Sequence, residues 1–202
     1  MDPHLRRMTR GVWNYSRKGD ERSHIRTAFR NLDVPRGASA GDSSMVLDYL
    51  RALDRAGSFR ADIVLIHVGT HDIKKDRHTG KNQVALPDYR RNVAAILAWF
   101  KRKRIKLVWI RGGPLDETLH NQRCQTFQRF EKDLDRYNRA AEALLARHRV
   151  PILDLAGFTR RLGPMNQLLK DHIHFKDDIV RLQAAFVTGY LINFLSRARS
   201  SR

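Results

Sequence analysis

Short apolar runs alternate along the chain with longer amphipathic segments. Residues 62–68 (DIVLIHV), 105–110 (IKLVWI) and 150–155 (VPILDL) are mostly apolar and contain many β-branched residues. Runs of this length and composition are typical of strands that are buried on both faces of a sheet. The shorter aromatic run 11–16 (GVWNYS) is a further candidate strand.

Apolar residues recur at helical spacing between these runs. The pattern predicts helices over residues 44–56, 87–100 and 178–195, and a proline such as Pro87 is well placed in the first turn of a helix. The clearest apolar stripe consists of Phe127, Phe130, Leu134, Tyr137, Ala141 and Leu144. Strands separated by helices predict βαβ crossovers, and therefore an α/β fold in which helices flank a parallel sheet in three layers.

One domain accounts for nearly the whole chain. Its 202 residues, of which 42% are hydrophobic, suffice for a single buried core. No internal repeat or low-complexity linker divides the sequence. We therefore expect one domain over residues 1–196 and a loose basic tail over residues 197–202.

The chain is strongly basic, because 39 Lys and Arg residues against 21 Asp and Glu residues give a formal net charge of +18. Such an excess raises the affinity for polyanions, nucleic acids included, without selecting one of them. The basic residues are spread along the chain, which favours a solvated basic surface over a nucleic-acid site. Nucleic-acid binding therefore stays open as a less favoured alternative.

Three features that the sequence lacks bear on the cellular compartment of the protein. Cys124 is the only cysteine, so an intrachain disulfide is impossible. No uninterrupted apolar run is long enough to cross a bilayer, and no apolar segment follows the N-terminal arginines as in a secretory signal. We expect a cytoplasmic protein without a membrane partner. The sequence does not predict the oligomeric state.

Three small motifs lie where the sheet would place a site. They are the glycine–serine loop 37–44, the segment 69–72 (GTHD) directly after an apolar run, and the segment 171–174 (DHIH) ahead of the last helix. Sites in parallel sheets lie at the carboxyl ends of the strands. His174 could act as a general base and Asp171 as its orienting carboxylate, although for this pair taken alone a solvated loop that caps the next helix is the favoured explanation.

The three motifs, in this order, resemble the blocks of the SGNH (GDSL-type) hydrolases, and the resemblance covers almost the whole chain. It implies a flavodoxin-like sheet, acyl-ester cleavage by a Ser-His-Asp mechanism, a small-molecule or carbohydrate ester as substrate, and no cofactor. In that scheme His174 is the general base and Asp171 its partner. The Gly41 N–H and His71 would bind the oxyanion.

His71 departs from the family pattern, which has asparagine at this position. A neutral imidazole also has an N–H to donate, so His71 could replace the amide at the oxyanion. Alternatively, His71 only supports its loop, for example by pairing with Asp72. The sequence leaves these two roles open.

The nucleophile is the second departure. In the family, a Gly-Asp-Ser block at the end of the first strand precedes the Gly41 loop. Residues 3–10 instead resemble the helix that follows that block, so the first strand and the serine are expected to be missing and the chain to be truncated or inactive. Ser43, in a literal Gly41-Asp42-Ser43, is a less favoured nucleophile, because residues 32–40 contain Pro35 and Gly37 and do not read as a buried strand.

Two other functions are considered. A metal site could draw on His67, His71, Asp72, His172 and His174, but these residues lack helical ligand spacing, so no metal is expected. The alternative from another class is a non-catalytic basic α/β module that binds anionic polymers. Salt-sensitive retention on heparin without any esterase activity would favour this module.

A flavodoxin-like sheet without its first strand would be less stable. That strand normally lies between the second and third strands, and its loss leaves unpaired edges that promote aggregation. We expect the protein to unfold below the range of ordinary mesophilic domains, about 45–65 °C. Circular dichroism on heating measures the transition, and a cooperative transition within that range would contradict the expectation.

Overall fold

Three parallel strands form the centre of the structure. The computed structural model describes residues 1–20, 38–57 and 59–200. The central strands are β1 (Ile63–Ile66), β3 (Lys106–Ile110) and β5 (Ile152–Leu153), in the order β1-β3-β5. Val64 pairs with Leu107, and Trp109 pairs with Ile152.

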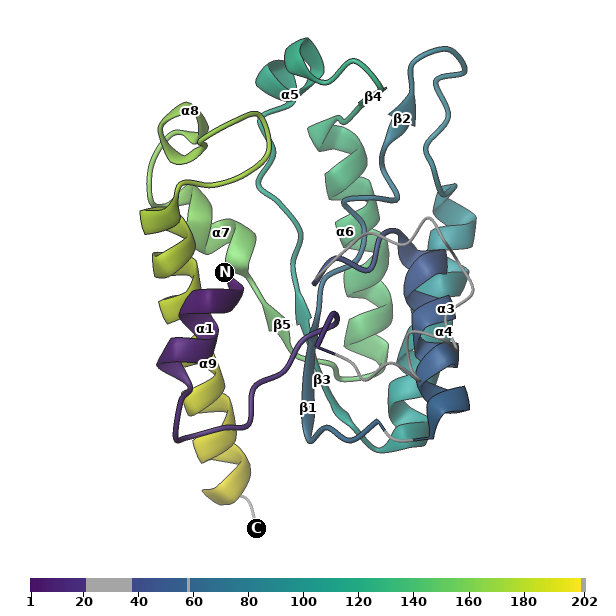
Figure 1. The fold of residues 1–202 in the computed structure, drawn as a ribbon. Helices are drawn as coiled ribbons and strands as arrows, with labels where there is room; N and C mark the ends of the chain where they lie inside the picture. The colour runs from purple at the N-terminus through teal and green to yellow at the C-terminus, as the bar shows by residue number, and fades with distance from the viewer. Residues whose placement is uncertain (21–37, 58, 201–202) are drawn as a thin grey trace.

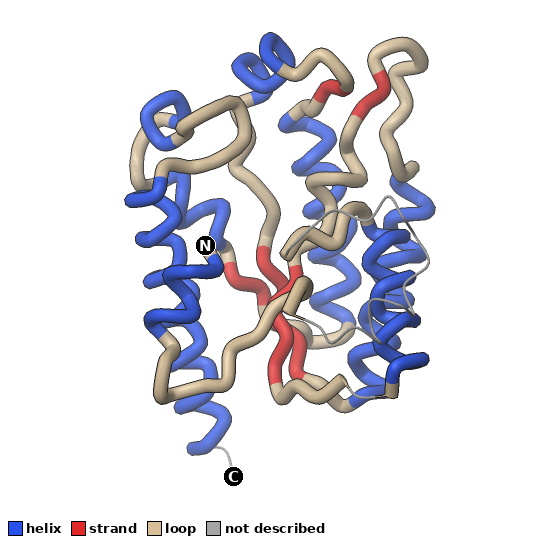
Figure 2. Tube along the Cα trace, viewed as in Figure 1, coloured by secondary structure: helices blue, strands red, loops and turns tan. Residues whose placement is uncertain are grey.

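Helices cover both faces of this sheet (Figures 1 and 2). One face carries α3 (Ser43–Ala56), α4 (Leu86–Lys103) and α6 (Glu131–Arg147), and the other carries α1 (Asp2–Met8), α7 (Leu155–Arg160) and α9 (Asp177–Ser200). The short helices α5 (Glu117–Arg123) and α8 (Met165–Leu168) and the two-stranded sheet of β2 (Lys75–Asp76) and β4 (Phe127–Gln128) lie at one end of the molecule. The expected three-layer α/β fold with a parallel sheet is confirmed.

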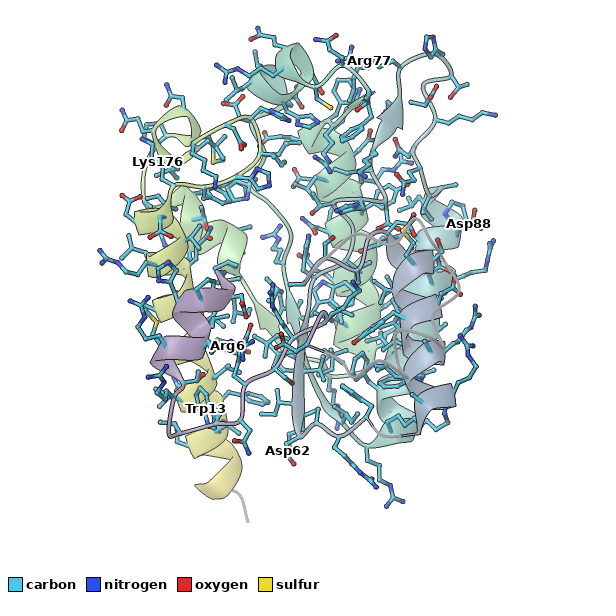
Figure 3. All side chains as sticks on the ribbon, viewed as in Figure 1. Arg6, Trp13, Asp62, Arg77, Asp88 and Lys176 are labelled. Carbon is cyan, nitrogen blue, oxygen red and sulfur yellow. The ribbon has the colours of Figure 1, made fainter. Side chains whose placement is uncertain are left out.

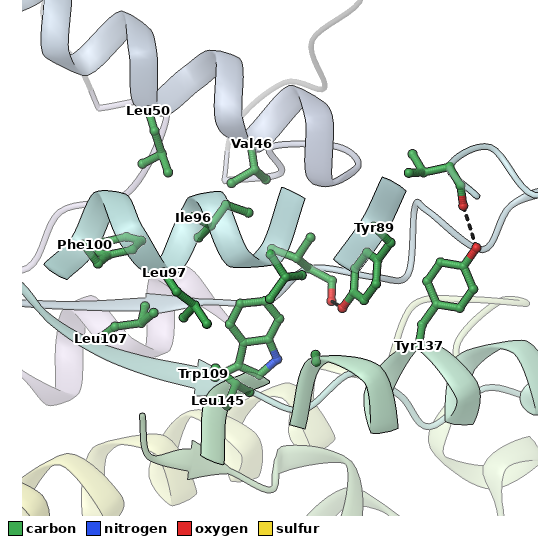
Figure 4. Packing of buried hydrophobic residues seen from close by; sticks show 14 of the residues in the cluster. Val46, Leu50, Tyr89, Ile96, Leu97, Phe100, Leu107, Trp109, Tyr137 and Leu145 are labelled. Atoms are coloured by element: carbon green, nitrogen blue, oxygen red, sulfur yellow. Dashed lines mark hydrogen bonds between the residues drawn. The ribbon is translucent and has the colours of Figure 1, made fainter. Parts of the chain in front are cut away.

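Alternating side chains on β1 point to two different cores. Val64 and Ile66 pack on the face with α3, α4 and α6, whereas Ile63 and Leu65 pack on the other face. Trp109, with 1% of its surface exposed, lies in the larger core together with Leu97 (Figure 4). A strand buried on both faces explains why residues 62–68 read as a continuous apolar run.

The second core joins the two ends of the chain. Leu5 from α1 packs with Ala184 and Val187 from α9 against the sheet. The His4 imidazole Nε2 lies 3.0 Å from an Asp177 carboxylate oxygen in the first turn of α9, and His4 is 9% exposed. The N-terminal helix is therefore fixed beside the beginning of the C-terminal helix.

In the described part of the chain, one helix is long and apolar enough to span a membrane, by length and composition alone. It is α9, whose segment Asp177–Ser196 has a mean hydropathy of 1.3. Arg181 interrupts the apolar sequence of this helix, so it contains no uninterrupted apolar run of that length. One side of α9 packs in the second core, whereas Leu182 and Ile192 are exposed.

Two sequence-based predictions are wrong. Residues 11–16 form no strand, because the N–H groups of Val12 and Trp13 both donate to the Thr9 carbonyl and turn the chain after α1. The helix expected from Phe127 begins only at Glu131, because Phe127 pairs with Asp76 in the small sheet.

Other boundaries also differ from the prediction. The third run forms a strand only at Ile152–Leu153, and α7 follows at once, with an Asp154 carboxylate oxygen accepting the Gly157 N–H at 2.9 Å. Helix α9 continues through Ser200, so most of the expected tail is helical, and residues 201–202 lie outside the described residues. Among the described residues, no strand pairs with the second edge of β1.

Tyr137 provides a test of the larger core. Its hydroxyl donates to the Val84 carbonyl oxygen at 2.5 Å (Figure 4), and the residue is 1% exposed. Tyr137→Phe removes this donor inside the core, so we expect a loss of about 1–3 kcal/mol of unfolding free energy in urea titrations. Tyr190→Phe, on a partly buried ring that stacks on Phe194, should cost less than about 0.5 kcal/mol. Equal losses in the two variants would contradict this role of the Tyr137 hydroxyl.

Candidate active site

Two loops meet at the carboxyl end of β1. The loop that contains Asp72 follows this strand, and the loop that contains Gly41 leads into α3. A buried Asp72 carboxylate oxygen accepts the Ser43 backbone N–H at 3.0 Å and joins the two loops. Two of the three predicted motifs are therefore adjacent in space. Gly37, at the start of the glycine–serine loop, lies outside the described residues.

Asp42 begins α3 and fixes its loop. One carboxylate oxygen accepts the backbone N–H groups of Ser44 and Met45 at 3.0 Å each, and the other accepts the Gln83 amide at 2.5 Å. A side-chain cap of this kind satisfies N–H groups that the first turn of a helix leaves without partners. Although burial opposes it, the pKa of Asp42 is lowered by the hydroxyl of Ser44, the N–H of Met45 and the amide of Gln83.

Two glycines allow the loops to approach closely. Gly41 has φ = +80° and Gly69 has φ = +132°, values that strongly favour glycine. A Cβ on Gly69 would also lie 3.3 Å from the Tyr89 hydroxyl, which donates to the Val68 carbonyl at 3.1 Å. Replacing Gly69 would therefore disturb the end of β1.

His71 is half-buried and neutral at pH 7. Burial, followed by the positive charges of Lys74 and Arg129, lowers the pKa of His71 to about 4. A neutral imidazole retains one N–H that can be donated to a developing oxyanion. Its neighbour Asp72 accepts a hydrogen bond from Ser43, and burial raises the pKa of Asp72 to about 6. No hydrogen bond between His71 and Asp72 occurs in the described structure.

Ser43 has a structural place at the beginning of α3. The residue is completely buried, and its hydroxyl accepts the Asn92 amide N–H at 2.9 Å. The structure shows no hydrogen bond between Ser43 and His174 within the described ranges. A substrate would have to displace packed protein to reach this hydroxyl.

Asp171 and His174 form the expected side-chain pair. The His174 Nδ1 lies 2.8 Å from one Asp171 carboxylate oxygen, and the other oxygen accepts the N–H groups of Ile173 and His174 at 2.8 and 2.7 Å. Burial acts to raise the pKa of Asp171, but the two N–H groups and the His174 imidazole lower it well below its usual range. An ionised carboxylate at Nδ1 leaves Nε2 of His174 as the nitrogen that is free to accept a proton.

The loop with this pair lies at the same end of the sheet as the Gly41 and His71 loops (Figure 1). Figure 3 shows Lys176, just after the pair, and Arg77 at that end, and Asp62 at the opposite end. Ile173 packs on the same core cluster as Ile73, two residues after His71. The described structure shows no direct contact between His174 and either His71 or Gly41.

Sequence reasoning missed a second histidine contact in this region. His67, at the end of β1, has Nε2 at 2.5 Å from the Thr70 hydroxyl and Nδ1 at 3.2 Å from the Ile110 carbonyl oxygen. A Cβ at position 112 would lie 2.3 Å from the His67 ring, so any larger residue there would displace this ring from its two contacts. The glycine after the apolar run 105–110 was the available signal for this close approach.

Sequence reasoning also missed the cations around His71. The Arg129 Nε donates to the Thr70 carbonyl at 2.9 Å, and the Lys74 backbone N–H donates to the His71 carbonyl at 3.2 Å. Because Phe127 was expected in a helix, the sequence analysis did not predict β4, and Arg129 directly follows this strand. Among the residues that the structure describes, no group of three or more potential metal ligands is found.

The imidazoles of this region give a prediction for pH dependence. Burial, then Arg129 and His172, lowers the pKa of the fully buried His120 to about 4, from an ordinary value of 6.5. The unfolded chain therefore binds a proton at higher pH than the folded chain. His120 stabilises the fold above about pH 6.5 and loses this contribution as the pH falls towards 4.

We expect the melting temperature of the protein to fall more steeply between pH 6.5 and 4 than that of His120→Phe. Asp72 acts in the opposite direction, because its raised pKa makes protonation favour the folded state. Its effect is common to both proteins and cancels in the comparison. Parallel profiles, measured by differential scanning fluorimetry, would contradict the assignment to His120.

Solved structures of ester hydrolases share this fold. A lipase/acylhydrolase from Enterococcus faecalis is 18% identical, with a TM-score of 0.56 over 75% of this chain and 71% of that one. A GDSL-like lipase from Bacteroides thetaiotaomicron is 18% identical, with a TM-score of 0.59 over 78% and 74%. The acetyl xylan esterase AlAXEase is 17% identical, with a TM-score of 0.58 over 75% and 77%.

The sequence itself identifies the family. No curated protein sequence shows significant similarity to this chain. The model of the GDSL-like Lipase/Acylhydrolase family, however, matches residues 8–182, which include the Gly41 and His71 loops and the Asp171–His174 pair. The chain belongs to the GDSL-like lipase/acylhydrolase family.

Proposed function

We propose that this protein cleaves acyl esters of small molecules or carbohydrates, with His174 as general base and Asp171 as its orienting carboxylate. The observation that carries the proposal is the 2.8 Å contact between the His174 Nδ1 and Asp171. This contact fixes the tautomer in which Nε2 can accept a proton, and it stabilises the imidazolium that forms. The similarly folded acetyl xylan esterase makes acetylated carbohydrates a reasonable first class of substrate.

Where a serine of the family type reaches the base, as in the longer protein considered below, the proposed reaction follows the family chemistry. His174 takes the proton of a hydroxyl nucleophile, whose oxygen attacks the acyl carbonyl carbon to form a tetrahedral intermediate. His174 returns the proton to the alcohol oxygen as the ester bond breaks. Water then attacks the acyl-enzyme with the same base and releases the acid.

His71 and the Gly41 N–H are the proposed oxyanion donors. The lowered pKa of His71 supports this role, because a neutral ring donates one N–H without carrying a fixed charge. The positive φ of Gly41 and the bond between Ser43 and Asp72 support a rigid position for the loop. Preorganised donors of this kind are worth roughly 3 kcal/mol each in related acyl transfers.

We propose that the 202-residue chain turns over esters slowly. Ser43 is completely buried, and its hydroxyl bonds to Asn92 instead of to an imidazole. A serine that serves as nucleophile needs contact with its base and exposure to substrate. On this basis Ser43 only begins helix α3, and it does not correspond to the nucleophilic serine of the family.

A 4-nitrophenyl acetate assay tests the proposal. We expect slow hydrolysis, above that of His174→Ala, because an oriented imidazole alone can activate water towards an activated ester. Asp171→Asn should lower the rate by roughly tenfold or more, since the wrong tautomer is then favoured. His148 is an exposed histidine directly after α6, and His148→Ala should leave the rate unchanged.

The outcomes separate the parts of the proposal. Equal rates for the protein and for His174→Ala would exclude the histidine as a base. Fast turnover that disappears in Ser43→Ala would instead make Ser43 the nucleophile. If the gene encodes Gly-Asp-Ser in frame ahead of residue 1, the longer protein should be faster in a manner that depends on His174.

A further inference from the structure

Cationic and imidazole side chains gather around the ring of Phe127. The Lys74 Nζ lies 5.0 Å and the Arg129 Cζ 4.9 Å from the ring centroid, and the His120 ring lies 5.5 Å from it. We call Lys74, His120, Phe127 and Arg129 the Phe127 cluster. The ring of His172, in the loop of the proposed base, lies 5.2 Å from that of His120.

Arg129 is a buried cation that pairs with no carboxylate of the described residues. Only 5% of its surface is exposed. Its Nε donates to the Thr70 carbonyl, and its backbone is held by the side chain of Asn121 through two 2.9 Å hydrogen bonds. No carboxylate lies within ion-pair distance of Arg129 or Lys74 in the described part of the chain. Buried charges are expensive unless they are paired.

The acidic residues nearby are already occupied. Asp42, whose charge is felt by Lys74, has its two carboxylate oxygens bound to the start of α3 and to Gln83. Asp72 accepts the Ser43 N–H. Asp133 forms its ion pair with Lys75, at 2.6 Å. None of these carboxylates neutralises the guanidinium of Arg129.

The titrating groups of the cluster reflect the unbalanced charge. Burial lowers the pKa of Arg129 to about 10, and burial followed by Arg129 lowers the pKa of Lys74. His120 and His71 are neutral for the same two reasons, burial and neighbouring cations. An anion placed here would be attracted by every charged member of the cluster, in surroundings that screen charge poorly.

His120 offers a second, independent sign of a ligand. It is completely buried, and neither ring nitrogen has a hydrogen-bond partner of normal geometry among the residues that the structure describes, although the backbone of His172 lies close enough to act against the lowering of its pKa. A buried polar group without a partner costs roughly 1–3 kcal/mol, so such groups commonly face a molecule that completes their bonding. The neutral ring could donate one N–H to an oxyanion.

The cluster is joined to the proposed oxyanion site. Arg129 binds the carbonyl of Thr70, the residue before His71, and the Lys74 N–H binds the carbonyl of His71. The side-chain charges of Lys74 and Arg129 both act on the His71 ring, so an anionic group that they bind would lie near an acyl carbonyl held by His71. That is the place where a second functional group of an ester substrate would lie.

We propose that Arg129 and Lys74 bind an anionic group of the substrate, so that the preferred esters carry a carboxylate or a similar small oxyanion. The inference rests on the proposed hydrolase function, which supplies the neighbouring carbonyl site. Arg129 supplies the more buried of the two charge-assisted contacts. Lys74, which is half-buried, makes the other contact from the side that solvent reaches.

Binding measurements test this proposal without requiring turnover. The probes are monomethyl succinate, which has one carboxylate, and dimethyl succinate, its neutral counterpart, titrated by calorimetry into the full-length His174→Ala protein. We expect the monoester to bind at least about tenfold more tightly than the diester, the usual gain from a charge-assisted hydrogen bond. Lys74→Gln and Arg129→Gln should each reduce this preference severalfold.

Arg147→Gln is the matched control. This exposed arginine ends α6, whose first residue follows the Phe127 cluster, so it lies at the opposite end of that helix. It removes the same charge from the protein and should preserve the preference for the monoester. An equal loss in Arg147→Gln would assign the preference to the net charge of +18 and overturn the proposal.

Two further outcomes decide the matter. Equal affinity for the monoester and the diester would exclude an anion site in substrate recognition, even if hydrolysis depends on His174. Inorganic phosphate binding as tightly as monomethyl succinate would indicate a site for a free oxyanion and would also overturn the substrate assignment. If Arg129→Gln unfolds, Lys74→Gln still tests the preference, because Lys74 is partly exposed.

Discussion

The hydrogen bond between the buried Asp72 carboxylate and the Ser43 N–H is the contact on which the geometry of the site depends. It connects the end of the first sheet strand with the beginning of α3, two segments separated by 29 positions in sequence. Burial of a carboxylate is costly, as the pKa of about 6 for Asp72 shows. The positions of Gly41 and His71 relative to one another are maintained by this bond.

The sequence predicted the parts of the fold that depend on local pattern. The run 62–68 is continuously apolar, and the stripe that ends near Leu144 recurs at helical spacing. Each pattern is long enough to predict the strand or the helix that contains it. Residues 11–16 have the composition of a strand, but pairing requires a neighbour, and the turn at Thr9 leads them past the sheet. The small sheet of β2 and β4 was not predicted, because strands of two residues are too short to leave a recognisable sequence pattern.

The site was predicted unevenly for a similar reason. Asp171 and His174 are three residues apart, so their contact is local and could be inferred from the motif. Arg129 donates a hydrogen bond to the carbonyl of Thr70, 59 positions away in the sequence. It follows a short strand whose residues were predicted to be helical. A resemblance to family blocks draws attention to the reacting groups. The unpaired cation beside them becomes visible only when distances and burial are known.

The contact between His4 and Asp177 has a practical consequence. It attaches the extreme N-terminus to the first turn of α9, three residues after the proposed base. Changes in α1 are therefore transmitted to the loop of the proposed base. A His4→Ala variant would loosen the first turn of α9 and, through it, the orientation of His174.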